Sequence, residues 1–523
     1  WVRRFGGSTN VDNTGAALGP RQKAPAAPRV ELEDVQGLVA RSFNGLKHGD
    51  YVPVYLPADA AAARAWVGEM AGVVTRGDRR SGEVLKEGVA RSLGFTADGL
   101  ARLGMDEESL RTFSTEFRDG MVTPYKQRVM GDDGPSAPQN WAWGRADNPV
   151  HAMIFVFAGT PQRLAELVDE ENARAASHGV TLGAPLGSVM LAQDKEHFGF
   201  HDGIAQPRVA GFGRTDDGEA PSPTESVIPA GEVVLGYTNA YGQLPDAPTV
   251  PDTAGARAVL PQAPRDPDDP PTAPVRMDLG KNGSYVVFRQ LEQHVKAFWS
   301  FLDAQARHDA EARKKLGAKM VGRWPNGAPL VLHPDQEPAV FDDKTANAFL
   351  YSGKYDDLRG DKCPLGSHIR RTNPRDGMQP GPEGSLLVAD RHRLLRRGRA
   401  YGEPVDPSFD PAEIIASDKP DTGRGLHFIC FNTDLGRQFE FVQSTWVNNM
   451  KFDGLYRDAD PLIGPHVNAG DPGIYPEQVT TFTEQRCPVR HQTHNVPRFV
   501  TTIGGAYFFM PGMRALRYLA RLD

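Results

Sequence analysis

Residues 284–302 read SYVVFRQLEQHVKAFWSFL, and this stretch decides the predicted fold. Its first five residues are an apolar run rich in β-branched and aromatic side chains, which is typical of a strand. The residues that follow carry apolar side chains at offsets 0, 4, 7 and 11, the spacing of one helix face, at Leu291, Val295, Phe298 and Leu302. LHFICF (426–431) precedes a second such face, at Leu435, Phe439, Val442 and Trp446. Each stretch predicts a strand followed by an amphipathic helix.

Two similar units lie earlier in the chain. YVPVYLP (51–57) is a predicted strand, and its helix is expected to start after Asp59, which serves as the N-cap. HAMIFVFAG (151–159) is the second strand, with Thr160 as N-cap and Pro161 at the first helical position. Four units, two in each half, indicate an α+β fold of duplicated ferredoxin-like halves with long insertions.

The halves are assigned to residues 31–270 and 271–523, because a long proline-rich segment at 214–280 separates the second and third units. Residues 1–30 are rich in glycine, alanine and proline and show almost no apolar periodicity. Such a segment buries too little surface to offset the entropy of ordering, so we predict a flexible N-terminal arm.

The charge balance excludes several classes of partner. The formal net charge is −7, and no basic run stands clear of acids, which argues against nucleic acid. No apolar run is long enough to span a bilayer, and none follows Arg3 and Arg4 as in a signal peptide, so we expect no membrane association and a cytoplasmic location. The chain begins at Trp1 rather than at Met. The sequence leaves the oligomeric state open.

Three cysteines, an odd and sparse set, predict free thiols rather than a disulfide framework. Cys487 lies close to His491 and His494, but three ligands without a second pair form a weak metal pattern, and solvated loop histidines are the preferred interpretation.

Two stretches carry the candidate chemistry. CPLGSHIRRTNPRD (363–376) and RHRLLRRGRAYG (391–402) combine histidine with clustered arginines. Haem requires an axial nitrogen, which imidazole supplies, and cations for its two propionates, which guanidinium supplies. The alternative is a basic surface loop with an incidental histidine. A third stretch, HFGFHDGIAQPRVAGFG (197–213), holds Asp202 among glycines, which by itself marks a turn.

GFHDGIAQP (199–207) and CPLGSHIRRTNPR (363–375) together resemble the dye-decolourising peroxidase family, in its larger bacterial and fungal-like branch. The resemblance continues in the same order along most of the chain, in GSYVVFRQLEQHV (283–295), MVGRWPNGAPL (320–330), LLRRGRAYG (394–402), DPLIG (460–464) and GGAYFFMP (504–511). It implies two ferredoxin-like halves of the dimeric α+β barrel type and a haem b cofactor. It also implies a peroxidase that reduces hydrogen peroxide and oxidises phenolic or dye-like organic donors through a ferryl intermediate.

The resemblance also implies roles for single residues. His368 matches the iron ligand, and we expect its other ring nitrogen to bond a carboxylate, best matched by Asp434. The alternative for Asp434 is an ordinary acid at a helix N-terminus. Asp202 is expected to move the peroxide proton, and Arg396 to stabilise the departing oxygen.

The remaining expectations concern the propionate contacts, the lining of the haem and a surface oxidation site. Propionate contacts are expected among Arg370, Arg371 and Arg375, and Phe509 is expected to line the haem. Tyr401 matches a tyrosine that serves some relatives as a surface oxidation site, and packing in a turn is its alternative.

Two rival functions remain at this point. The first is a haem-handling protein without peroxidase turnover, and the second is a haem-free interaction module in which His368 is an ordinary loop residue.

Overall fold

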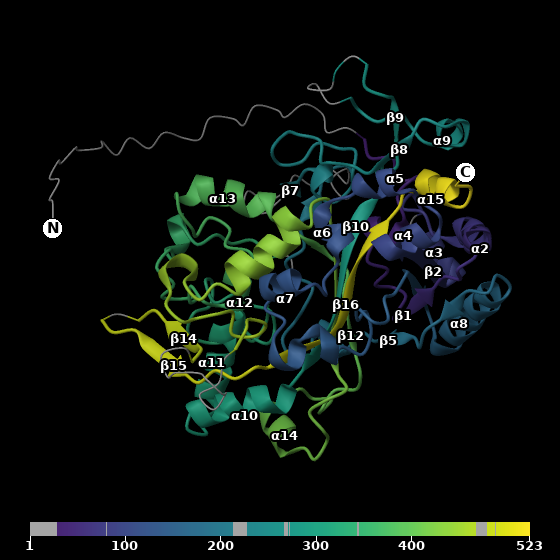
Figure 1. Ribbon diagram of the computed structural model, residues 1–523. Helices are drawn as coiled ribbons and strands as arrows, with labels where there is room; N and C mark the ends of the chain where they lie inside the picture. Colours follow the sequence, from purple (N-terminus) through teal and green to yellow (C-terminus); the bar gives the residue numbers. More distant parts are fainter. Residues whose placement is uncertain are drawn as a thin grey trace.

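The computed structural model describes residues 29–79, 81–212, 227–265, 270, 272–341, 345–466, 479–486 and 488–522 (Figure 1). Residues 1–28 lie outside this part, so the predicted arm is not assessed, and neither is Cys487. Cys363 and Cys430 are buried free thiols. Within the described residues, no group of three or more metal-ligating side chains is present, and no helix is long and apolar enough to cross a membrane.

The N-terminal half contains an antiparallel sheet in the order β2-β3-β1-β4. Its strands are β1 (His48–Tyr55), β2 (Val89–Phe95), β3 (Ala152–Ala158) and β4 (Thr181–Leu182). Helix α2 (Ala60–Val73) follows β1, and α8 (Pro161–Ala176) follows β3. The predicted N-caps are confirmed, because Asp59 accepts the N–H of Ala61 and Thr160 accepts that of Arg163.

The C-terminal half repeats this arrangement in the order β16-β10-β13-β11. Its strands are β10 (Ser284–Gln293), β11 (Leu395–Arg396), β12 (Arg399–Tyr401), β13 (Gly425–Asn432) and β16 (Val500–Met510). Helix α10 (Val295–Gln305) follows β10, as predicted. After β13 the chain forms π-helical segments, η6 (Gly436–Glu440) and η7 (Val442–Val447), where the sequence predicts an ordinary helix. π-Helical turns are rare and are found most often at functional sites.

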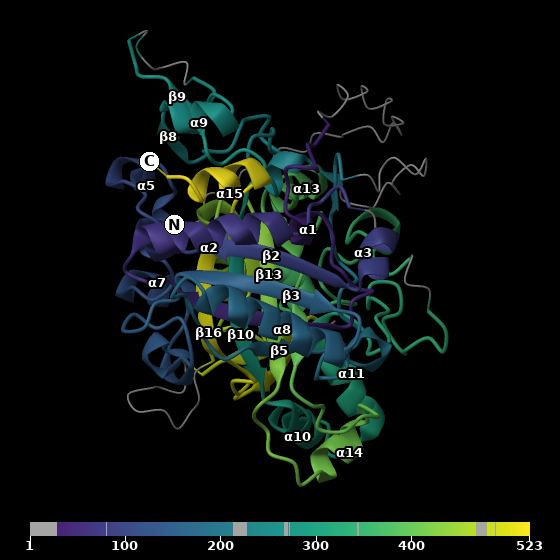
Figure 2. The ribbon, with the colours of Figure 1, turned by 90° about the vertical axis from the view of Figure 1, so that its right-hand side faces the viewer.

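β11 and β12 both pair with β13 and are counted here as one edge strand. With the strands of each half numbered along the chain, both halves then have the order 4-1-3-2, which is the ferredoxin-like order. The halves join through a single pair, Phe509 of β16 with Phe95 of β2, so that the strands of both halves form one 10-stranded sheet. Figure 2 shows β1, β2 and β3 crossing the direction of β10, β13 and β16 at a steep angle. The predicted α+β class with two ferredoxin-like halves is confirmed.

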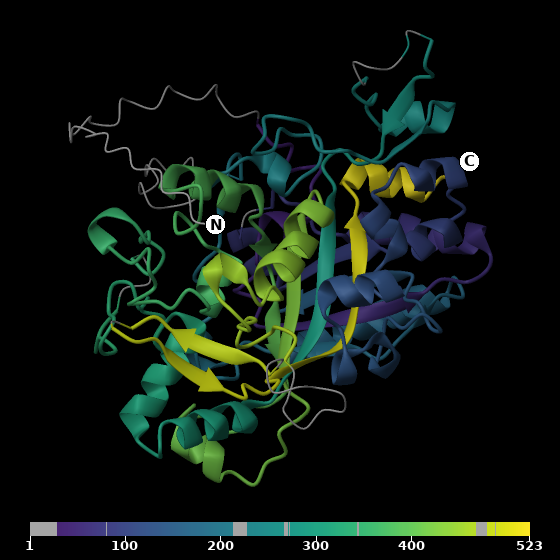
Figure 3. The same cartoon turned by 60° about the vertical axis from the view of Figure 1, so that its left-hand side comes forward.

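The other elements belong mainly to the long insertions. They are α1 (Gly37–Ala40), α3 (Ser81–Glu87), α4 (Ala97–Arg102), α5 (Glu107–Arg111), α6 (Thr115–Asp119), α7 (Pro124–Met130), β5 (Leu186–Ser188), β6 (Arg208–Val209), β7 (Val227–Ile228), β8 (Thr249–Pro251), α9 (Ala254–Val259), β9 (Arg276–Asp278), α11 (Ala310–Val321), α12 (His368–Thr372), α13 (Pro382–Arg391), α14 (Pro411–Ala416), β14 (Thr481–Glu484), β15 (His491–His494) and α15 (Met513–Leu519). Two-stranded sheets separate from the 10-stranded sheet are formed by β6–β7, β8–β9 and β14–β15. In Figure 3 the helices α10, α11 and α14 and the hairpin β14–β15 lie together at one end of β10 and β13. Helix α12, which begins with His368, packs against η7 and α11.

Candidate active site

His368 is the first residue of α12 and is hydrogen-bonded to an acid far along the chain. Its Nδ1 lies 2.9 Å from Oδ2 of Asp460, which is fully buried. The other oxygen of Asp460, Oδ1, accepts the backbone N–H groups of Leu462 at 2.9 Å and Ile463 at 3.1 Å. These bonds fix the orientation of the carboxylate and therefore of the imidazole. Because Nδ1 is occupied, Nε2 is the ring nitrogen that remains for a metal.

The charge of Asp460 is stabilised despite its burial. Burial alone would raise its pKa, but His368 and Arg371 outweigh that effect and hold the pKa below its usual value. An ionised carboxylate beside Nδ1 makes the imidazole a more electron-rich ligand.

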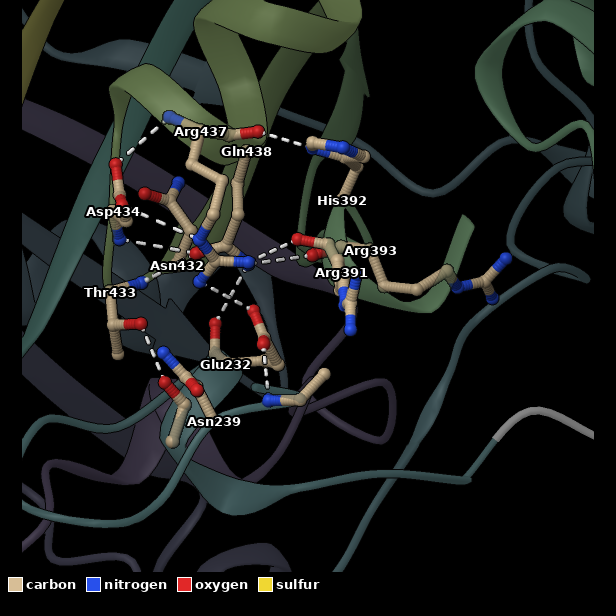
Figure 4. A network of polar contacts seen from close by, with 12 residues as sticks. Glu232, Asn239, Arg391, His392, Arg393, Asn432, Thr433, Asp434, Arg437 and Gln438 are labelled. Atoms are coloured by element: carbon tan, nitrogen blue, oxygen red, sulfur yellow. Dashed lines mark hydrogen bonds and ion pairs between the residues drawn. The ribbon is translucent and has the colours of Figure 1, made fainter. Parts of the chain in front are cut away.

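The prediction that Asp434 bonds His368 is therefore wrong. Asp434 precedes η6 and accepts the backbone N–H of Arg437 at 2.9 Å, the role of an ordinary acid at a helix start. Figure 4 shows it within a network with Arg437, Gln438 and Glu232. Asp460 lies in the DPLIG motif, but no local pattern in the sequence indicates that it contacts a histidine 92 positions earlier.

Arg370 and Arg371 are also not placed as predicted. Both are fully buried, but they donate to the protein itself. Arg370 bonds the carboxylate of Asp357 and three backbone carbonyls, and its guanidinium stacks on Tyr351 at 4.0 Å. Arg371 bonds the carbonyls of Trp446, Asn449, Asp458 and Gly366. These arginines anchor α12 to the surrounding chain, and their donors are not free for a propionate.

A different set of arginines gathers near the site. Arg323, Arg393 and Arg375 are buried, and Arg396 is partly buried. Burial and the charge of Arg375 lower the pKa of Arg323 to about 9 and that of Arg393 to about 9, and Arg396 acts in the same direction on both. Asp390 acts in the opposite direction on Arg393, and Asp376 does so on Arg375.

Such clustered cations fit a dianionic ligand. Nη2 of Arg323 and Nε of Arg393 are buried donors without a hydrogen-bond partner, and a buried donor of this kind costs free energy until it is paired. Two propionates would pair them, so the residues present fit a haem. Arg375 remains a candidate, although it also donates to the carbonyls of Asn347 and Phe349. Sequence reasoning missed Arg323, which lies in MVGRWPNGAPL (320–330), and Arg393, which lies in RHRLLRRGRAYG (391–402).

Asp202 lies on a loop, residues 194–203, which we call the distal loop. The residue is exposed, and its Oδ1 accepts the N–H of Gly203 at 2.6 Å. Gly203 has φ of +81°, a left-handed conformation that favours glycine. The turn predicted from the sequence is thus confirmed.

Arg396 comes from the C-terminal half and is linked to the segment that follows the distal loop. It lies on β11 opposite Cys430 of β13, and its backbone N–H donates to Oε1 of Gln206 at 3.0 Å. Gly398 packs so closely on β13 that a Cβ there would lie 2.3 Å from the carbonyl oxygen of His427. A side chain at that position would collide with β13, so Asp202 and Arg396 remain the candidate distal residues.

The prediction of a surface oxidation site at Tyr401 is wrong in this structure. Tyr401 is 8% exposed and packs 4.7 Å from the ring of His427, and its hydroxyl is buried without a hydrogen-bond partner. Burial raises its pKa. A bulky donor cannot reach the ring.

Two further residues are assigned to packing. Phe509, predicted to line the haem, is fully buried where the halves join and packs against Phe113 and Tyr285. His392, the next histidine along the chain after His368, stacks on Phe441 at 3.9 Å and hydrogen-bonds the carbonyl of Arg437 through Nδ1 (Figure 4).

Comparison with known proteins decides the family. Residues 272–457 match the family model described as Dyp-type peroxidase, C-terminal. The multifunctional dye peroxidase DyP2 of Amycolatopsis sp. is 30% identical over 481 residues, which cover 88% of this chain and 90% of that protein. This chain belongs to the dye-decolorizing peroxidase family.

The same family includes the dye-decolorizing peroxidase AauDyP1 of Auricularia auricula-judae, 28% identical over 95% of this chain and 88% of that protein. A crystal structure of the decolorizing peroxidase of Auricularia auricula-judae superposes with a TM-score of 0.70 at 23% identity, over 94% of this chain and all of that one. The DyP-type peroxidase of Anabaena sp. superposes with a TM-score of 0.69 at 22% identity, over 93% and 94%. Membership of the dye-decolorizing peroxidase family implies a haem cofactor, hydrogen peroxide and organic electron donors.

Proposed function

We propose that this protein holds haem b through Nε2 of His368 and uses hydrogen peroxide to oxidise phenolic and other bulky organic donors. The observation that carries the proposal is the bond of His368 to the buried Asp460, together with two buried arginine donors, Nη2 of Arg323 and Nε of Arg393, that have no hydrogen-bond partner among the described residues. When bound, haem supplies an iron that binds peroxide and accepts its oxidising equivalents. Arg323, Arg375 and Arg393 would hold the propionates.

The distal residues supply the acid–base chemistry. Asp202 accepts the proton of one peroxide oxygen and delivers it to the other, which leaves as water. The guanidinium of Arg396 stabilises the negative charge that develops on the departing oxygen. Two one-electron donors then restore the resting enzyme, so that one peroxide yields two waters and two oxidised donors.

A visible absorption spectrum of the purified protein tests the proposal. A Soret band whose position and intensity change on addition of hydrogen peroxide, followed by oxidation of a phenolic donor, supports it. A Soret band that peroxide leaves unchanged would instead favour a haem-handling protein. Absence of the band after reconstitution with haem b would exclude both functions.

A further inference from the structure

Glu196 binds the distal loop from within. Its Oε2 accepts the backbone N–H of Phe198 at 2.8 Å, and its Oε1 accepts that of Phe200 at 2.9 Å. Oε2 also accepts the side-chain Nε2 of Gln293, the last residue of β10, at 2.7 Å. One carboxylate therefore joins two backbone groups of the loop to the central sheet.

The backbone closes the same turn. The N–H of Glu196 donates to the carbonyl of Phe200 at 2.9 Å, and the N–H of Gly199 donates to the carbonyl of Glu196 at 2.8 Å. The indole N–H of Trp299 on α10 donates to the carbonyl of Phe198 at 3.1 Å. This turn ends two residues before Asp202, so its shape sets where the Asp202 carboxylate stands.

Gln293 shows that the bond to Glu196 is a strong one. Gln293 is 2% exposed, and its Oε1 is buried without a hydrogen-bond partner. Leaving an amide oxygen unpaired is costly, and the cost is tolerated when the N–H of the same amide makes a charge-assisted bond. An ionised Glu196 provides that acceptor.

We propose that Glu196 is a positioning residue for Asp202: its carboxylate holds the distal loop in the shape that presents Asp202 to peroxide. The inference rests on the proposed function and extends it to a residue outside the reacting groups. A protonated carboxyl has lost one acceptor, because one oxygen then carries hydrogen, so protonation of Glu196 loosens the loop.

The pKa of Glu196 lies close to neutral pH. Burial raises its pKa to about 7, against the opposing effect of the bonds from Gln293, Phe198 and Phe200, and Asp202 raises it further. Lys195 also interacts with it. The loop is therefore expected to tighten as the pH rises through neutrality.

The test compares Glu196→Gln with wild-type holoprotein in two measurements. Gln replaces one acceptor oxygen by an NH₂ group that faces a backbone N–H, so amide hydrogen exchange over residues 196–203 should become faster. The reaction with peroxide, followed by stopped flow, should be about tenfold slower. In wild type the protection of these amides, which is the exchange rate corrected for its intrinsic pH dependence, should change across neutral pH together with the peroxide rate. In the variant the change in protection should be absent.

Glu292→Gln is the matched control, since Glu292 is the neighbour of Gln293 on β10 and accepts the N–H of Gly423 instead of contacting the loop. The Glu292→Gln variant should behave as wild type.

Gln293→Met removes one of the three bonds to the Glu196 carboxylate and keeps the charge, so it should show a smaller effect. It serves as the second variant if Glu196→Gln does not fold. Unchanged exchange and an unchanged pH profile in both variants would overturn the proposal. Failure of wild type to react with peroxide would overturn the proposed function, while hydrogen exchange would still decide the role of Glu196 in the loop.

Discussion

His368 and Asp202, on the two sides of the proposed haem site, differ in how they are held. The imidazole of His368 is 2.9 Å from a fully buried carboxylate whose second oxygen accepts two backbone N–H groups. Asp202 is exposed, and its carboxylate accepts the N–H of the next residue. In the His368–Asp460 pair, every polar side-chain atom except Nε2 of His368 has a hydrogen-bond partner. The carboxylate of Asp202, by contrast, stays exposed.

This difference follows from what each side has to do. An axial ligand needs one fixed orientation and a constant electron-donating strength, so it gains from a rigid, charged partner. A group that accepts and returns a proton must be open to its substrate, and it is best positioned through the backbone that carries it. The anchoring of α12 through Arg370 and Arg371, and of the distal loop through Glu196, fits this division.

The largest effect is expected from removing the ligand of the first side. His368→Ala should lose most of the bound haem, because the next histidine along the chain, His392, is stacked on Phe441 and bonded to a carbonyl. The ratio of Soret to protein absorbance measures haem content. His308→Ala is a control at a histidine on the protein surface. Native haem content in His368→Ala would make the ligand assignment wrong.

On the second side, Arg396→Leu should slow the reaction with peroxide about 100- to 1,000-fold, because the guanidinium acts on charge that develops as the oxygen–oxygen bond breaks. Haem content should change little, since Arg323, Arg375 and Arg393 remain. Stopped-flow mixing with peroxide measures the rate. A rate equal to wild type would remove Arg396 from the chemistry, and a parallel loss of haem would assign it to cofactor binding instead.

Asp460→Asn tests the fixed partner of the first side. The amide keeps the shape but loses the charge that fixes the imidazole, so haem affinity or peroxide reactivity should fall about 10- to 100-fold. Asp434→Asn is the matched control and should leave both unchanged, because Asp434 caps η6. Equal effects of the two substitutions would contradict the assignment of Asp460.

The His368–Asp460 pair should also affect how the free energy of unfolding depends on pH in the acid range. The pKa of Asp460 is lowered in the folded state, so its contribution to stability is present above the ordinary carboxyl pKa and is lost as the pH falls below it. The free energy of unfolding of Asp460→Asn, measured with denaturant, should therefore vary less with pH in the acid range than that of wild type. A parallel pH dependence in both proteins would contradict the ionised state of Asp460.

The smallest effect is expected at Tyr401. Tyr401→Phe removes a buried hydroxyl that has no partner, so the free energy of unfolding should stay the same or rise by up to about 1 kcal/mol. Turnover of a bulky anthraquinone dye should be unchanged, because the ring is covered. A steep fall in dye turnover at normal peroxide reactivity would restore Tyr401 as a site of donor oxidation.

Local patterns predicted a large part of the molecule. The strands at 51–57, 151–159, 284–288 and 426–431 and three of the helices that follow them were confirmed, because side-chain periodicity and capping act within a few residues. The fourth helix was predicted from the same periodicity but is π-helical, which spacing alone does not distinguish.

Errors concentrated where a residue type allowed several partners. The run at 370–375 contains three arginines with equal local claims on a propionate, and the structure commits the first two to carbonyls. Phe509 and Tyr401 carry apolar or aromatic side chains beside site motifs, and both proved to be core residues.

The sequence by itself determined the α+β class, the duplicated halves, the family resemblance and the histidine that matches the iron ligand. Each of these depends on short-range spacing or on contiguous motifs, which can be recognised in the sequence without the structure. Only the tertiary structure decided that Asp460 rather than Asp434 pairs with His368, and that Arg323 and Arg393 join Arg375 and Arg396. Those choices depend on contacts between residues far apart in the chain, where burial selects one partner among chemically equal side chains.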